Sequence, residues 1–194
     1  MLVHMILLQK IANFLILLLI DVFSRYGFKK TTMGDIADHV GISRQTLYAS
    51  YPNKEEVLAA AMLFLTEKTM IEVRELWQNQ NTISEKVDTF FEHTILKYFR
   101  AVQSMPDSED LLSGPDGFGK DALKHVDQLK TELLAELFSP YEAPLAKLDT
   151  NPKDFADFVL KSASGFKYSA ESEEQLLKLL GSLKQSMTLM LAEK

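Results

Sequence analysis

The chain has 194 residues, a length that accommodates one or two small domains with a substantial core. Hydrophobic residues make up 46% and charged residues 25% of it, which is typical of soluble globular proteins and argues against disorder. There is no cysteine, and the four histidines are scattered without metal-ligand spacing. We therefore expect no disulfide, no thiol chemistry and no metal site, and we expect a cytoplasmic location.

The net charge of −6 is distributed unevenly along the chain. Residues 1–54 carry six basic and three acidic side chains, a net charge of +3, whereas the remainder has a net charge of −9. Because a DNA duplex is lined with phosphates, a basic head on an acidic body would bind DNA with one end and repel it from the other.

Residues 1–20 are almost entirely apolar and allow three interpretations. A signal peptide would need a positive amino-terminal region and a small-residue cleavage site, and neither is present. A membrane span would be interrupted by Gln9, Lys10 and Asn13. A core helix fits best, with membrane association as the alternative. The apolar positions recur with helical spacing at Ile11, Leu15, Leu18, Val22 and Tyr26.

The opposite face of this expected helix carries Phe14, Leu17 and Ile20. These residues form an apolar patch that we expect another segment to shield from water. The nearest cover is residues 1–8, which are themselves apolar. We expect residues 1–8 to be ordered and to support solubility rather than DNA binding, since no Lys or Arg precedes Lys10.

Residues 32–51 have the pattern of a helix-turn-helix. Thr32 and Asp35 are spaced to cap the first helix reciprocally. Gly41 follows where a left-handed residue would close that helix, and Ser43 is a suitable cap for the next one. The turn is then about three residues long, as a helix-turn-helix requires.

The second helix of this unit would bury Leu47 and direct Arg44, Gln45 and Thr46 outward. Arg can donate two hydrogen bonds to guanine, Gln can pair with adenine, and Thr can contact a thymine methyl group. We predict that these three residues read base edges. The residues that we expect to contact DNA phosphates are Thr32, Ser43, Tyr48, Tyr51 and Lys54.

A specific set of spaced positions is similar to the DNA-binding domain of the TetR/AcrR family of bacterial transcriptional regulators. They are Thr32, Asp35-Ile36-Ala37, Gly41-Ile42-Ser43, Thr46-Leu47-Tyr48, Tyr51 and Asn53-Lys54-Glu55. Tyr51 stands where the family more often has Phe, a change that keeps an aromatic plug. The resemblance implies an all-α fold, with a three-helix helix-turn-helix DNA-binding domain over residues 1–54 and a helical ligand-binding and dimerisation domain over residues 55–194.

The rest of the chain shows helical periodicity only, with a loop expected over Ser104 to Lys120, where Pro, Gly and acidic residues gather. Three pairs of residues have the spacing of helix starts, namely Asn53 with Glu56, Asn151 with Pro152, and Ser172 with Gln175. The predicted helices cover about 54–78, 84–102, 121–138, 152–166 and 172–191.

Aromatic residues of the second part could either pack in a core or line a ligand pocket, and the pattern leaves both possibilities open. If a pocket exists, we expect it to bind a small apolar or aromatic effector. The candidate lining residues are Trp77, Phe91, Tyr98, Phe118, Phe138, Tyr141 and Phe158.

The last predicted helix has apolar residues on two sides and so needs two partners. The resembled family dimerises through its last two long helices, which implies a homodimer here. Burial of this helix within one subunit is the alternative. The residues that we expect at the dimer interface are Phe158, Phe166, Leu176, Leu180, Leu183, Met187 and Met190.

Together these features predict a ligand-responsive regulator, most simply a repressor that a small molecule releases from a palindromic double-stranded DNA operator. The chain has no Gly-rich phosphate loop, no His-Glu-x-x-His motif and no paired Ser and His, so we expect no catalytic residue and no cofactor. We expect no membrane partner. The alternative is a helical interaction or membrane-associated protein that uses its apolar amino-terminal segment without sequence-specific DNA binding.

Overall fold

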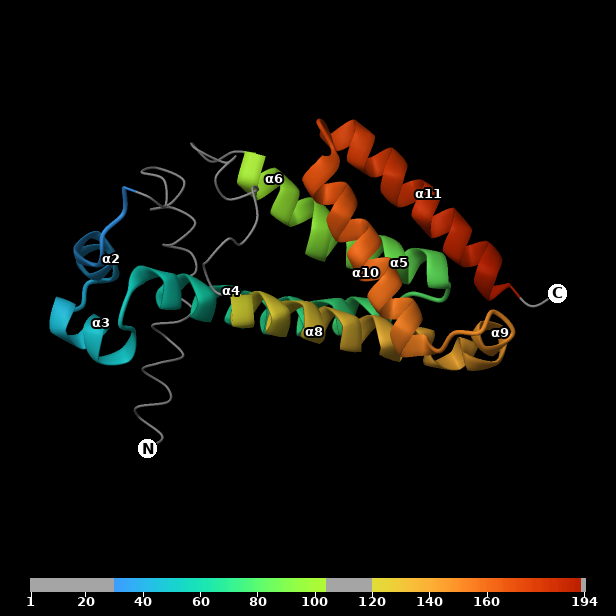
Figure 1. Ribbon diagram of the computed structural model, residues 1–194, viewed down its shortest axis with the longest axis horizontal. Coiled ribbons are helices and arrows are strands. Elements are labelled where there is room, and N and C mark those ends of the chain that lie inside the picture. The colour runs from blue at the N-terminus through green and yellow to red at the C-terminus, as the bar shows by residue number, and fades with distance from the viewer. Residues whose placement is uncertain (1–29, 104–119, 193–194) are drawn as a thin grey trace. The chain divides into compact units, whose positions relative to one another are not determined.

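The computed structural model describes residues 30–103 and 120–192, in which only helices and connecting turns occur (Figure 1). This confirms the predicted all-α class. The expected core helix in residues 1–20, the cover by residues 1–8 and the pocket candidate Phe118 lie outside the described residues.

The elements are α2 (Met33–Val40), α3 (Arg44–Ser50), α4 (Lys54–Trp77), α5 (Ile83–Phe91), the π-helical segment η1 (Glu92–Leu96), α6 (Lys97–Gln103), α8 (Lys120–Phe138), the 3-10 turn η2 (Ser139–Tyr141), α9 (Glu142–Ala146), α10 (Pro152–Ser169) and α11 (Glu173–Leu191).

The chain divides into two compact units, one of residues 1–65 and 102–126 and the other of residues 66–101 and 127–194. The first unit therefore extends past residue 54, where the sequence placed the domain boundary. The reason is that Val57 and Ala61 of α4 are buried in the same small core as the helix-turn-helix. The buried members of that core are Met33, Ile36, Ala37, Leu47, Val57 and Ala61.

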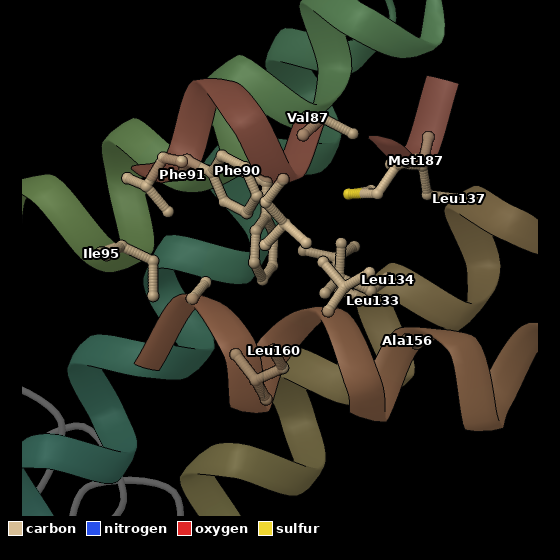
Figure 2. Close-up of a cluster of buried hydrophobic side chains, with 14 of the residues drawn as sticks. Val87, Phe90, Phe91, Ile95, Leu133, Leu134, Leu137, Ala156, Leu160 and Met187 are labelled. Carbon is tan, nitrogen blue, oxygen red and sulfur yellow. The ribbon is translucent and has the colours of Figure 1, made fainter. Parts of the chain in front are cut away.

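The second unit is built around one large apolar core to which every one of its long helices contributes (Figure 2). The ring of Phe138 on α8 meets that of Phe155 on α10 edge to face, with 5.0 Å between the ring centres. Figure 2 shows Phe90, Leu134 and Met187 converging from α5, α8 and α11. Burial of these side chains is the main source of stability in this unit.

Polar side chains tie neighbouring helices of the second unit together at the rim of this core. The guanidinium group of Arg74 on α4 donates to Glu136 on α8 over 2.9 and 2.8 Å. The ammonium of Lys184 on α11 lies 2.6 Å from a carboxylate oxygen of Asp88 on α5. Because these pairs are partly exposed to water, they fix the packing register more than they stabilise the fold.

The helix expected over residues 84–102 is interrupted. Thr82 caps it reciprocally with Glu85, so it begins at Ile83. At Glu92–Leu96 the backbone winds as a π-helix before α6 continues. Side-chain periodicity does not reveal such a segment because its wider hydrogen-bond pattern depends on the helices packed against it.

The remaining predicted helix starts are confirmed by their caps. The side chain of Asn151 accepts from the backbone N–H groups of Lys153 and Asp154, both at 3.0 Å, and Pro152 occupies the first turn of α10. Ser172 accepts from the N–H of Gln175 at the start of α11. Within the described residues, no helix is both long and apolar enough to traverse a bilayer.

Four of the seven residues predicted at the dimer interface lie in the core of a single subunit. Leu176, Leu180, Leu183 and Met187 are all buried against the other helices of the second unit. The row that these side chains form on α11 therefore already has a partner within its own chain. Phe166 is partly buried, and Phe158 and Met190 are exposed.

The pocket candidates also divide by burial. Trp77, Phe91 and Phe138 are closely packed core residues, and the indole N–H of Trp77 donates to the carbonyl of Lys86 over 2.8 Å. Tyr141 packs on the edge of the same core. Phe158 is 51% exposed and lines no interior space. Among the pocket candidates that the structure describes, Tyr98 is the one whose ring lies beside a buried charged group, the ammonium of Lys167.

Candidate nucleic-acid interface

The first helix of the helix-turn-helix, α2, begins and ends as its sequence predicts. The Thr32 backbone N–H and hydroxyl donate to the Asp35 carboxylate over 2.8 and 2.7 Å, and the N–H of Asp35 donates back to the Thr32 hydroxyl. These hydrogen bonds lower the pKa of Asp35. Gly41 ends the helix with φ of 72°, a left-handed conformation that glycine adopts without strain.

The second helix, α3, starts at a polar cap. The hydroxyl of Ser43 accepts from the backbone N–H of Thr46 over 3.0 Å, and the two hydroxyl groups lie 2.8 Å apart. Leu47 is the buried residue of α3, as predicted. The hydroxyls of Ser43 and Thr46 therefore already have a local partner before any phosphate or base approaches.

Arg44, Gln45 and Thr46 are consecutive, exposed residues in the first turn of α3. Gln45 is open to solvent, and so is Tyr48 one turn further along. The structure therefore brings together the three side chains that the sequence predicted as base readers, on the helix that a helix-turn-helix presents to the major groove.

The side chain of Arg44 does not extend freely from α3. It reaches back over α2, where the guanidinium group lies against the backbone of Gly34, and its Nη2 is 3.8 Å from a carboxylate oxygen of Asp38. Both charged side chains are largely exposed, so the ion pair between them is weak and can give way to a stronger acceptor such as a guanine edge.

The start of α4 adds a positive group. The side-chain oxygen of Asn53 accepts from the N–H of Glu56 over 2.8 Å, as the predicted cap requires. The ammonium of Lys54 donates to the carbonyl of Thr31 over 3.0 Å, so this side chain also links α4 to the segment before α2. Tyr51 is half-buried against the small core, and burial raises the pKa of its hydroxyl.

The sequence profile described as "Bacterial regulatory proteins, tetR family" matches residues 19–61, the part of the chain that includes this unit. Over these residues the chain is similar to the DNA-binding domain of TetR-family regulators. An uncharacterized HTH-type transcriptional regulator of Bacillus subtilis, YezE, is 29% identical over 76 residues. That alignment covers 39% of either chain, so it spans well under two thirds of the length of the curated relative.

Solved structures extend the TetR-type fold over nearly the whole chain. A TetR-family regulator from Syntrophomonas wolfei has a TM-score of 0.67 and 15% identity, over 96% of this chain and 97% of that one. FadR of Thermus thermophilus, a TetR-family repressor in complex with lauroyl-CoA, has a TM-score of 0.62 and 20% identity, over 93% of both chains. At these identities the likeness shows a shared fold.

Two residues of this TetR-type interface were not identified from the sequence. Gly34 leaves the space that Arg44 occupies, and Asp38 pairs with the same guanidinium group. The available signal for Gly34 was a glycine in the first turn of a predicted helix, since glycine often marks the close approach of another group. For Asp38 the signal was weaker, namely an acidic residue within a basic segment.

Proposed function

We propose that this protein is a ligand-responsive transcriptional repressor that binds a palindromic DNA operator as a homodimer in the cytoplasm. The observation that carries the proposal is the exposed row of Arg44, Gln45 and Thr46 at the start of the second helix of a TetR-type helix-turn-helix. These residues contact base edges, and Tyr48, Tyr51 and Lys54 with the capped hydroxyls of Thr32 and Ser43 contact phosphates.

The dimer forms through the exposed apolar side chains of α10 and α11. Five of the nine large apolar residues that are exposed in the described part of the chain lie on these two helices. Such a concentration of apolar surface is typical of an interface between subunits. The five residues are Phe158, Tyr168, Leu177, Leu189 and Met190.

An effector in the second unit controls operator binding by changing the distance between the two recognition helices. A palindromic operator needs these helices about 34–36 Å apart. α4 contributes residues to both units and is the continuous connection through which a change in one reaches the other. A coupling of about 1–3 kcal/mol would reduce operator occupancy about 5- to 150-fold. The lauroyl-CoA complex of the Thermus thermophilus repressor supports an effector with an apolar part.

Selection of binding sites from a random DNA pool tests this function. We expect a palindromic sequence to be enriched and to be bound far more tightly than a shuffled duplex. Arg44→Ala and Gln45→Ala should each lower this discrimination by about 1–3 kcal/mol. Lys153→Ala, an exposed change on α10, is the control and should leave binding unchanged. If no sequence is enriched, the helical interaction or membrane-associated alternative becomes the better account.

A further inference from the structure

Lys167 occupies a position at which α10 should carry an apolar residue. The row of α10 that faces the core runs through Ala156, Leu160 and Ala163 and reaches Lys167 next. Lys167 is only 7% exposed. Its ammonium lies 4.3 Å from the ring centre of Tyr98 on α6 and 4.4 Å from that of Tyr168.

A second lysine, Lys130, is partly buried on α8. Lys130 lies one turn after the buried Val126 and one turn before the buried Leu133 and Leu134. The positive charge of Lys130 acts on Lys167 and lowers the pKa of that ammonium. Two separate helices therefore bring a lysine to the same part of the second unit.

Neither ammonium has a partner of opposite charge among the described residues. No carboxylate oxygen in that part of the chain lies within 4.0 Å of Lys130 or Lys167. The acidic group that acts on both is Asp127, which is exposed and compensates only in part. Burial, followed by the repulsion from Lys130, lowers the pKa of Lys167 to about 8.

Buried charges in proteins are normally paired, because an unpaired charge loses its hydration without compensation. The two tyrosine rings interact favourably with a cation, but they cannot neutralise it. The hydroxyl of Tyr98 forms no hydrogen bond with any other described residue. Tyr98 lies two residues after the π-helical segment Glu92–Leu96, and segments of this kind are frequent at functional sites.

We propose that Lys130, Lys167 and Tyr98 form a binding site for the anionic oxygen group of the effector, a carboxylate or a phosphate ester. This inference rests on the proposed ligand-responsive function and specifies its chemistry. The two ammonium groups supply the charge, the Tyr98 hydroxyl supplies a further donor, and the apolar part of the effector packs against the ring of Tyr98 and the neighbouring core.

A matched pair of fluorescent probes tests the site directly in the full-length protein. Anilinonaphthalene sulfonate and N-phenylnaphthylamine share one aromatic skeleton and differ by the sulfonate group. We expect the anionic probe to bind at least about tenfold more tightly, the gain of one hydrogen bond to a charged group. Lys167→Met and Lys130→Met should each remove this preference and leave the affinity for the neutral probe unchanged.

Lys161→Met is the matched control, because Lys161 is an exposed lysine of α10 whose ammonium pairs with Asp157 over 2.6 Å. It should keep the preference for the anionic probe. Lys167→Met should also raise the thermal midpoint, since it removes an unpaired buried charge, so loss of the fold cannot explain lost probe binding. Equal affinity for the two probes, no binding of either, or a preference that survives in Lys167→Met would overturn the proposal.

Competition with naphthoate, naphthyl phosphate and naphthalenemethanol then separates the two sources of the anionic group. Displacement by naphthoate alone assigns a carboxylate, displacement by naphthyl phosphate alone assigns a phosphate ester, and equal displacement by the alcohol contradicts the site. Operator binding is measured separately. If the anionic probe binds through Lys167 but leaves operator affinity unchanged, the site stands and the coupling in the proposed function fails.

Discussion

The guanidinium group of Arg44 lies against the backbone of Gly34, where a side chain would not fit beside it. A Cβ atom built on Gly34 would be 2.6 Å from Nη2 and 2.7 Å from Cζ of Arg44. The contact joins the two helices of the helix-turn-helix and fixes the direction of the Arg44 side chain.

Gly34→Ala should therefore displace Arg44 and lower sequence discrimination without harming the fold. Gly34 is the second residue of α2, where the helical backbone accepts alanine, and the end of the Arg44 side chain can move. We expect an unchanged or higher thermal midpoint together with a loss of discrimination up to that of Arg44→Ala. Fluorescence anisotropy with operator and shuffled duplexes measures it. Wild-type discrimination in Gly34→Ala would show that the observed direction of Arg44 is unimportant for reading DNA.

Lys54→Ala should weaken the binding of all duplexes by a similar factor. We propose its ammonium as a phosphate-binding group, and it donates to the carbonyl of Thr31 at the start of α4. Loss of one phosphate contact should reduce the salt slope of binding by about 1. The variant should also be slightly less stable, because a hydrogen bond contributes about 1 kcal/mol. A change in the preferred sequence would contradict this assignment.

Substitutions on α11 should separate the dimer interface from the subunit core. Leu189 is 79% exposed and Met190 is also exposed, whereas Leu183 lies in the core. Leu189→Glu with Met190→Glu should give folded monomers, since a charge at an apolar interface opposes association. Leu183→Glu should unfold the protein instead, since it buries an unpaired charge. Light scattering with circular dichroism distinguishes the two results, and a persisting dimer in the double variant would place the interface elsewhere.

The stability difference between wild type and Lys167→Met should depend on pH. The pKa of Lys167 is lowered in the folded protein from 10.5 to about 8 by burial and Lys130, while Asp127 opposes the shift; Tyr98 and Tyr168 also face it. The unfolded chain then binds more protons between pH 8 and 10.5, so wild-type stability rises across this window relative to the variant.

Below pH 8 the variant should be more stable, with an upper bound on the order of 3 kcal/mol. The difference should shrink as the pH rises towards 10.5. Urea unfolding of both proteins from pH 7 to 10 measures the effect, and Lys161→Met should show a small difference that is flat over this range. A constant difference between wild type and Lys167→Met would mean that Lys167 is already paired or hydrated.

The helix-turn-helix could be predicted because its boundaries depend on hydrogen bonds between residues a few positions apart. Thr32 with Asp35, Ser43 with Thr46, and the left-handed Gly41 are local features, and each appears in the structure as expected. The exposure of residues 44–46 followed from the same local argument, since one buried residue, Leu47, fixes which side of a short helix faces outward.

In the second unit, only the tertiary structure shows which helices pack against each apolar helix face. Apolar periodicity showed that α11 has two faces to cover, but it does not tell whether Leu183 packs inside one subunit or between two. Likewise, Lys130 of α8 and Lys167 of α10 are visible in the sequence, but only the packing brings the charge of Lys130 close enough to act on Lys167 and places Lys167 over the ring of Tyr98. Periodicity predicts that one face of a helix is buried. Which helices pack against that face depends on long-range contacts, and these cannot be predicted from a short stretch of sequence.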